Sequence, residues 1–141
     1  MQLHPAVLMF IAHRHAEGRI LDALHAAGFD LTLSQARLAA RIGPDGTRAT
    51  ELAEQAQLTK QSAGSLVEAL EVGGYVERVP DPSDARARLV RLAEHGKRAQ
   101  QVARREERAI VREWEAHLGA RRFADLVESL GRLREIVDPY Q

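Results

Sequence analysis

The chain has 141 residues, 45% of them hydrophobic, and its 20 lysines and arginines balance its 20 aspartates and glutamates. This length fits one compact unit with helical extensions, and the balanced charge argues against a general polycationic nucleic-acid binder but leaves room for a local basic face. The absence of cysteine excludes disulfides, thiolate zinc sites and thiol switches. Since neither a secretory signal nor an apolar run of about 18 residues is found, we expect a soluble, cytoplasmic protein without membrane contact.

Two helices are expected at the N-terminal end. Residues 5 to 27 carry leucine and isoleucine at helical spacing, and Gly28 ends this helix. The next helix starts at Thr32, because Thr32 and Gln35 have the spacing of a capping box. A Gly-Pro-Asp-Gly turn at 43–46 follows, through which no helix can continue.

Two shorter helices come next and are joined by a tight turn. The first covers residues 48 to 58, with Thr47 or a near neighbour as its cap. Thr59 is placed to cap the second, with its oxygen facing the amide near Ser62. This second helix stops at the glycine pair 73–74.

A β-hairpin is predicted after the short helices. Residues 75 to 79 alternate between apolar and polar side chains as a strand does. Residues 80 to 84 are expected to form a loop, since their two prolines fit neither a central strand nor a helix. Residues 88 to 92 give a second short strand.

The rest of the chain reads as helix. Residues 93 to 118 are expected to form a long charged helix, and a break is expected at Gly119 because glycine commonly follows a helix end. The last helix has a clean apolar stripe, made by Phe123, Leu126, Val127, Leu130, Leu133 and Val137.

This order of elements is that of a winged helix-turn-helix, so the predicted fold class is mainly α with a small β-hairpin wing. In such a fold the second helix of the pair enters the major groove, and its N-terminal residues meet base edges. Glutamine can bond adenine bidentately, and lysine can reach guanine or a phosphate. From these side chains alone, a merely solvated helix face is an equally good interpretation, and the order of elements favours DNA. The predicted DNA-binding residues on this helix are Thr59, Lys60, Gln61, Ser62 and Ser65.

The predicted wing adds Arg86 and Arg88 to the DNA-binding residues. An arginine on a hairpin can enter the minor groove, where A·T-rich narrowing strengthens the negative potential. The structural alternative is that Arg86 pairs with Asp84 or Asp81 and shapes the loop, and both interpretations can hold together. Residues 86 to 105 carry seven basic side chains against one acidic one, which extends a basic stripe from the wing into the long helix.

With these residues in view, the sequence resembles the MarR family of bacterial transcriptional regulators. The motif-level match runs from about residue 31 to residue 97 and beyond that rests on helix order only. The segments that carry it are Leu31-Thr32-Leu33-Ser34-Gln35, Glu51-Leu52-Ala53, Thr59-Lys60-Gln61, Leu66-Val67-Glu68-Ala69-Leu70-Glu71, Gly74-Tyr75-Val76-Glu77-Arg78, Asp81-Pro82-Ser83-Asp84-Ala85-Arg86 and Gly96.

The resemblance implies a dimer that binds a palindromic operator, commonly as a repressor, with a small aromatic acid or phenol bound between the dimer helices and the DNA lobe. Carried over by position, Lys60, Gln61 and Ser65 would read the major groove, Arg86 would enter the minor groove, and Asp84 would brace the wing. Three departures from the family pattern stand out: Ala85 replaces a usual basic residue, Ala93 replaces a usual capping threonine, and Gly64 lies inside the recognition helix.

The terminal helices favour a homodimer, because their apolar stripes have no obvious partner in a small winged lobe. The alternative is that they pack on each other in a monomer. We therefore expect an N-terminal dimerisation helix in 1–30, a DNA-binding lobe in 31–95, and a long helix plus dimerisation helix in 96–141.

The sequence offers no catalytic or metal-binding motif. The six histidines form no i, i+4 pair, so no metal site and no cofactor are expected, although His13, His15 and His117 could cluster near a ligand cleft. No phosphate-binding loop, nucleophile elbow or zinc-protease motif is found, and we expect no enzyme. The competing functional class is a winged-helix module that binds protein instead of DNA; its recognition face should be more apolar.

Overall fold

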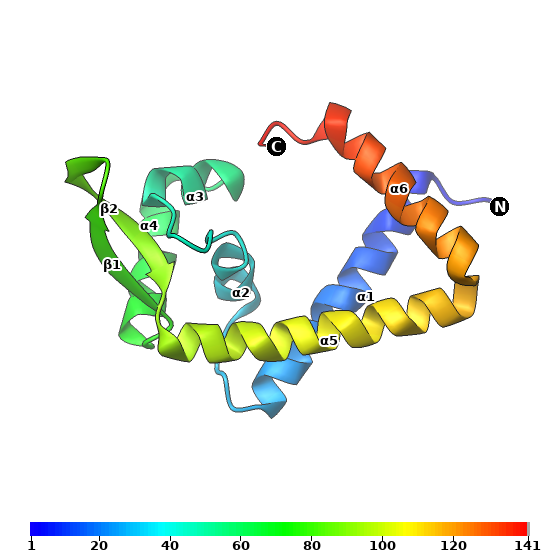
Figure 1. Cartoon of the computed structure of the whole chain (residues 1–141), viewed down its shortest axis with the longest axis horizontal. Coiled ribbons are helices and arrows are strands. Elements are labelled where there is room, and N and C mark those ends of the chain that lie inside the picture. Colours follow the sequence, from blue (N-terminus) through cyan, green and yellow to red (C-terminus); the bar gives the residue numbers. More distant parts are fainter. Residues whose placement is uncertain (141) are drawn as a thin grey trace.

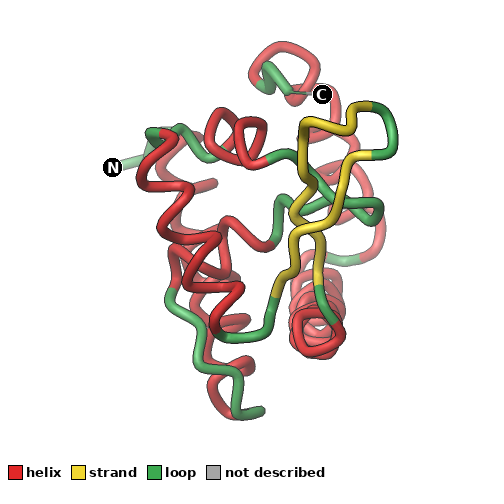
Figure 2. Tube along the Cα trace, turned by 90° about the vertical axis from the view of Figure 1, so that its left-hand side faces the viewer, coloured by secondary structure: helices red, strands yellow, loops and turns green. Residues whose placement is uncertain are grey.

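The computed structural model describes residues 1–140 and confirms a mainly helical chain with one β-hairpin. Helix α5 runs the length of the molecule, with α4 and the hairpin at one end and the turn into α6 at the other (Figure 1). Figure 2 views the molecule from the hairpin end and shows the hairpin beside the helical lobe. In chain order the elements are α1 (Pro5–Ala26), α2 (Leu33–Ala39), α3 (Ala49–Gln55), α4 (Lys60–Val72), β1 (Val76–Asp81), β2 (Asp84–Leu92), α5 (Glu94–Leu118) and α6 (Ala120–Val137).

The core of the winged lobe lies between α2, α3, α4 and the hairpin. These elements each contribute an apolar side chain from the face that helical or strand spacing turns inward. Full burial of one such side chain stabilises the fold by about 1.5–3 kcal/mol. The largest fully buried side chains are Leu38, Leu52, Val67, Leu70 and Val90.

Helix α1 joins the lobe through its C-terminal half only. Leu24 is buried, and the chain after Gly28, which has a φ of +88°, brings Phe29 and Leu31 into the same core. Helix α1 also packs along α5, where Arg19 forms ion pairs with Glu106 and Glu113. The first helix is thereby fixed to both the lobe and the long helix.

The start of α5 depends on a close approach to the carbonyl of Tyr75. The predicted loss of a side-chain cap at Ala93 is confirmed, and the N–H of Ala93 instead donates to that carbonyl at 3.0 Å. A Cβ atom on Gly96 would lie 2.1 Å from the same oxygen, which no side chain can tolerate. Gly96 is therefore required for the contact between α5 and the end of α4.

The hairpin is longer than the sequence indicated. Strand β1 continues through Pro80, which pairs with Arg88, to Asp81, which pairs with Asp84, so the expected loop shrinks to residues 82 and 83. Proline is tolerated here because both strands of a two-stranded sheet are edge strands, and a register shift accompanies it between Pro80 and Asp81.

Thr47 has a different role from the expected helix cap. It forms an isolated antiparallel bridge with Val90 of β2, and its hydroxyl accepts a hydrogen bond from Gly43 at 2.9 Å. Arg48 occupies the N-cap position of α3 without a side-chain cap. The loop before α3 is thus attached to the hairpin.

The apolar stripe of α6 is uncovered in the single chain. No residue of α6 is buried, and Leu126, Val127, Leu130 and Leu133 are between 38% and 53% exposed. The first half of α1 is similarly exposed from Val7 to Ile11. The two stripes do not bury each other, as the monomer alternative would require.

Candidate nucleic-acid interface

The start of α4 is built by the predicted cap. Gln57 adopts a φ of +54°, which turns the chain sharply out of α3, and Thr59 then accepts the N–H of Ser62 at 3.0 Å. The hydroxyl of Thr59 also donates to that of Ser62 at 3.0 Å. This network fixes the direction of the helix and keeps both hydroxyl groups at its exposed N-terminal end.

Helix α4 presents a polar front opposite its apolar face. Ala63, Val67 and Leu70 are buried, whereas all five predicted DNA-binding residues of this helix are exposed. The Ser65 hydroxyl donates to the carbonyl of Gln61 at 3.1 Å, so its oxygen is left with acceptor capacity only. The side chains of Lys60 and Gln61 remain available as donors.

The hairpin carries Arg86 and Arg88 on its surface, and both side chains are exposed. The backbone N–H of Arg86 donates to Asp84 at 2.9 Å, but the guanidinium of Arg86 forms no ion pair within residues 1–140. Asp84 therefore shapes the loop through the backbone of Arg86, and the expected pairing of the Arg86 side chain with Asp84 or Asp81 is not observed in these residues.

The strongest brace of the wing is Asp81, which the sequence suggested only as a possible partner of Arg86. Its carboxylate accepts from the N–H and the hydroxyl of Ser83, both at 2.8 Å, and from Arg48 at 2.9 Å. These hydrogen bonds, those from Ser83 first, lower the pKa of Asp81, and the pairing raises the pKa of Arg48. The Asp-Pro-Ser order is an Asx-turn signal that could have revealed half of this cluster. Asp84 contributes more weakly, at 3.9 Å from Arg48.

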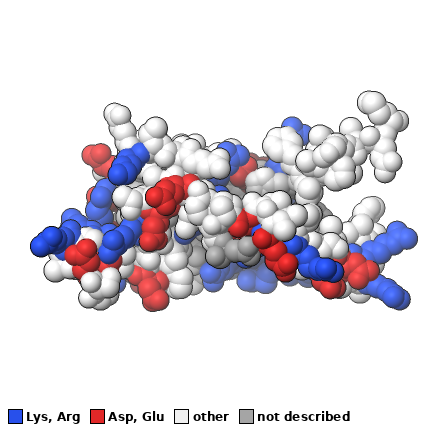
Figure 3. Space-filling view, turned by 90° about the horizontal axis from the view of Figure 1, so that it is seen from above, with Lys and Arg blue, Asp and Glu red and all other residues white. Residues whose placement is uncertain are grey.

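Ion pairing separates the cations of the lobe into two groups. Arg48, Arg78 and Arg91 are held by Asp81, Glu71 and Glu77, respectively. The remaining cations of residues 48 to 92 form no ion pair within the described chain, and they are the three predicted to contact DNA: Lys60, Arg86 and Arg88. Figure 3 shows Lys and Arg side chains gathered with acids among them at the hairpin end, on the left. The chain therefore has unpaired cations in the winged lobe although its net charge is near zero.

A cavity of about 690 Å³ lies between α1, α2 and α5. Its lining includes the apolar Ile20, Leu24 and Leu31 and three arginines, Arg37, Arg41 and Arg104. Arg37 is held by Glu17 through hydrogen bonds of 2.7 and 2.8 Å, which lower the pKa of Glu17 and raise that of Arg37. The cavity thus combines apolar walls with guanidinium groups.

His95 has a structural role in the core of the winged lobe. His95 packs against Phe29 and Tyr75, with ring centroids 5.1 and 4.6 Å away. Of the suggested cluster, His13 lines the cavity and lies 3.5 Å from Glu17, whereas His15 and His117 are not brought to it. Within residues 1–140 no three His, Asp or Glu side chains are placed to hold a metal ion. None of the helices in these residues has the length and apolarity needed to cross a membrane.

Comparison with known proteins agrees with this geometry. A model of the MarR family matches residues 29–87, which cover α2 to the first residues of β2. No curated protein sequence matches the chain. Among solved structures, the chain is similar to wild-type MarR of Escherichia coli in its apo form, with 20% identity over 94% of this chain and 98% of that one and a TM-score of 0.73.

Two further structures extend the likeness. FabT of Streptococcus pneumoniae, solved in complex with DNA, is 16% identical over 96% of this chain and 98% of its own, with a TM-score of 0.72. A transcriptional regulator of Thermotoga maritima is 22% identical over 94% and 92%, with a TM-score of 0.66. The resemblance to the MarR family is thereby confirmed for the winged lobe, and the chain as a whole has the fold of MarR-family transcriptional regulators.

Proposed function

We propose that two copies of this chain form a sequence-specific DNA-binding transcription regulator. Helix α4 of each copy enters the major groove of a palindromic operator, and Arg86 of each hairpin enters the minor groove beside it. The observation that carries the proposal is that the hairpin, which bears the exposed Arg86 and Arg88, lies at the same end of the molecule as α4, which bears the exposed Lys60 (Figure 1). None of these three cations forms an ion pair within the described residues. The DNA complex of FabT supports this use of the fold.

The homodimer is supported by the uncovered apolar stripes of α1 and α6. Exposed apolar surface of this extent is unfavourable in water, and a second copy offers the same stripes for mutual burial. We assign dimerisation to residues 1–30 and 96–141, and DNA binding to residues 31–95. A two-fold dimer would place the operator half-sites about one helical turn apart.

The regulator is proposed to act as a repressor whose operator affinity changes when a small aromatic acid or phenol binds. The cavity between α1, α2 and α5 supplies apolar walls for a ring and arginines for an acidic group. A ligand carboxylate would compete with Glu17 for Arg37, and that ion pair links α1 to α2. The cavity therefore lies between the dimerisation helices and the DNA lobe. No enzymatic activity is part of this proposal.

Selection of tight-binding duplexes from a random pool, followed by titration at several salt concentrations, tests the DNA-binding function. We expect a palindromic consensus and an affinity that falls as salt rises, because cationic contacts release counterions from the phosphates. The double variant Lys60→Ala, Arg86→Ala should lose this affinity, whereas Arg112→Ala, near the other end of α5, should retain it. If no duplex is enriched, the protein-binding module becomes the better account.

A further inference from the structure

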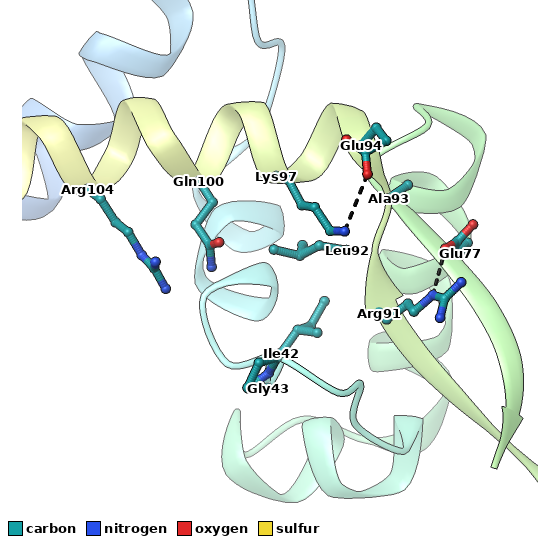
Figure 4. A pocket seen from close by; sticks show the side chains of 11 residues that line it. Ile42, Gly43, Glu77, Arg91, Leu92, Ala93, Glu94, Lys97, Gln100 and Arg104 are labelled. Carbon is teal, nitrogen blue, oxygen red and sulfur yellow. Dashed lines mark hydrogen bonds and ion pairs between the residues drawn. The ribbon is translucent and has the colours of Figure 1, made fainter. Parts of the chain in front are cut away.

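A second cavity, of about 550 Å³, borders the N-terminal half of α5 (Figure 4). It faces the root of the hairpin and the loop between α2 and α3, and its apolar lining includes Ile42 and Leu92. Leu92, Gln100 and Arg104 border both cavities, whereas Arg91 and Lys97 line only this one. The two spaces can therefore be distinguished by substitution.

Helix α5 lines this cavity with Lys97, Gln100 and Arg104. Their i, i+3, i+7 spacing puts them on one helix face, and in Figure 4 their side chains extend from α5 toward the cavity. A helix rises about 1.5 Å per residue, so the backbone positions of Lys97 and Arg104 are about 10 Å apart along the axis. Two separated cations thus flank an amide group.

The acids of the cavity do not neutralise these cations equally. Glu77 holds Arg91 at 2.6 Å, and Glu94 holds Lys97 at 3.3 Å. Arg104 forms no ion pair with any part of the chain that the structure describes. The Glu94 side chain is 80% exposed, and such a pair contributes little and is readily exchanged. After losing Lys97 as a partner, the Glu94 carboxylate would still be stabilised by the helix dipole, because Glu94 lies in the first turn of α5.

We propose that this cavity is a binding site for a small linear dicarboxylate. One carboxylate pairs with the guanidinium of Arg104, and the other replaces Glu94 as the partner of Lys97. The amide N–H of Gln100 donates to the ligand between them, and the carbon chain lies over the apolar side chains of Leu92 and Ile42. With Glu94 displaced, the two ligand charges balance the two cations.

The site lies next to the contacts that hold the hairpin to the helix-turn-helix. Arg91 belongs to β2, and the residue before it, Val90, is bridged to Thr47 of the loop before α3. A ligand between α5, β2 and the loop before α3 therefore contacts three elements that set the position of the wing. Its binding can be measured without DNA, so this inference stands or fails independently of the proposed function.

Calorimetric titration of the DNA-free protein with linear dicarboxylates of increasing chain length tests the site, with monocarboxylates of equal length as controls. We expect the best-fitting dicarboxylate to bind at least about tenfold more tightly than its monocarboxylate, since each additional charge-assisted contact is worth roughly this factor. Lys97→Gln should abolish this preference. Arg37→Gln, which alters only the cavity between α1 and α2, should leave it unchanged.

Three results would overturn the proposal: equal binding of both ligand types, a preference that survives Lys97→Gln, or one that disappears in Arg37→Gln. The last would place the dicarboxylate in the other cavity. Circular dichroism of both variants confirms that they fold, which is expected because Lys97 and Arg37 have side chains 58% and 57% exposed.

Discussion

The guanidinium of Arg48 reaches across from the start of α3 to the carboxylate of Asp81, with its Nε and Nη2 atoms 2.9 and 2.8 Å from Oδ2. The two residues are 33 positions apart, and Asp81 is only 9% exposed. This ion pair fixes the outer part of the hairpin relative to the helix pair. The direction of the wing therefore depends on a residue at the N-cap of a helix.

Asp81→Asn should loosen the hairpin. We expect a clear loss of DNA affinity but only a small fall in the melting temperature, since the contact positions the wing and lies outside the core. The pKa of Asp81 is lowered in the folded chain, so its carboxylate stabilises the fold above the ordinary Asp pKa of about 3.9 and loses this effect as the pH falls through the lower folded value. The difference in melting temperature between wild type and variant should therefore shrink below about pH 4.

Thermal unfolding from neutral pH down to about pH 3 checks this dependence. Asp45→Asn is the matched control, because Asp45 is exposed in the turn before α3. A constant gap between wild type and Asp81→Asn across this range would show that the ionised Asp81 does not stabilise the hairpin.

Local signals in the sequence predicted much of this fold. The capping box at Thr32, the cap at Thr59 and the break at Gly119 each depend on residues within a few positions, and all three are confirmed. By contrast, the bridge from Thr47 to Val90 and the pairing of Arg48 with Asp81 join distant segments. Such contacts depend on how the elements pack together, and the local spacing of residues in the sequence does not predict this packing.

The candidate site was predictable in part for the same reason. The exposed front of α4 follows from helical spacing around Ala63, Val67 and Leu70. The spacing does not predict which cations remain unpaired. Glu71 and Glu77 meet their arginines only because α4 and the hairpin pack as they do. Net charge over the segment was therefore a poor guide to its surface.

Gly96→Ala should destabilise the protein by about 1–3 kcal/mol or more, because overpacking forces the backbone apart. The added Cβ would meet the carbonyl of Tyr75 at 2.1 Å. Gly64→Ala is the matched control on another helix, where a Cβ meets nothing within 4 Å and alanine should stabilise the helix by about 1 kcal/mol. Chemical denaturation measures both, and equal effects would contradict the close approach of α5.

Leu130→Asp should convert the proposed dimer to a monomer, because it places a charge in the centre of the α6 stripe. Leu130 is 41% exposed in the single chain. Val72→Asp is the control, since Val72 is 84% exposed but lies on α4, outside the stripe. Sedimentation velocity distinguishes the species. A wild-type monomer, or a dimer that survives Leu130→Asp, would refute the proposed interface.

Gln61→Ala should relax the base preference at one position of each half-site, at a cost of about 1–3 kcal/mol, because a bidentate contact to adenine would be lost. The side chain of Gln61 is exposed on the front of α4. Duplex selection with the variant measures the preference, and Gln101→Ala, an exposed glutamine of α5, serves as control. An unchanged consensus would remove Gln61 from base recognition.

Arg86→Ala should weaken binding most on operators with A·T-rich flanks, because the narrow minor groove there attracts an inserted guanidinium most strongly. The Arg86 side chain is exposed and pairs with no acid in the part of the chain that the structure covers, so its full charge is available. Loss of one phosphate-proximal cation should also lower the salt dependence of binding by about one ion. Anisotropy titrations on duplexes that differ only in their flanks measure both effects. Equal losses on A·T-rich and G·C-rich flanks would mean that Arg86 binds the backbone without reading groove width.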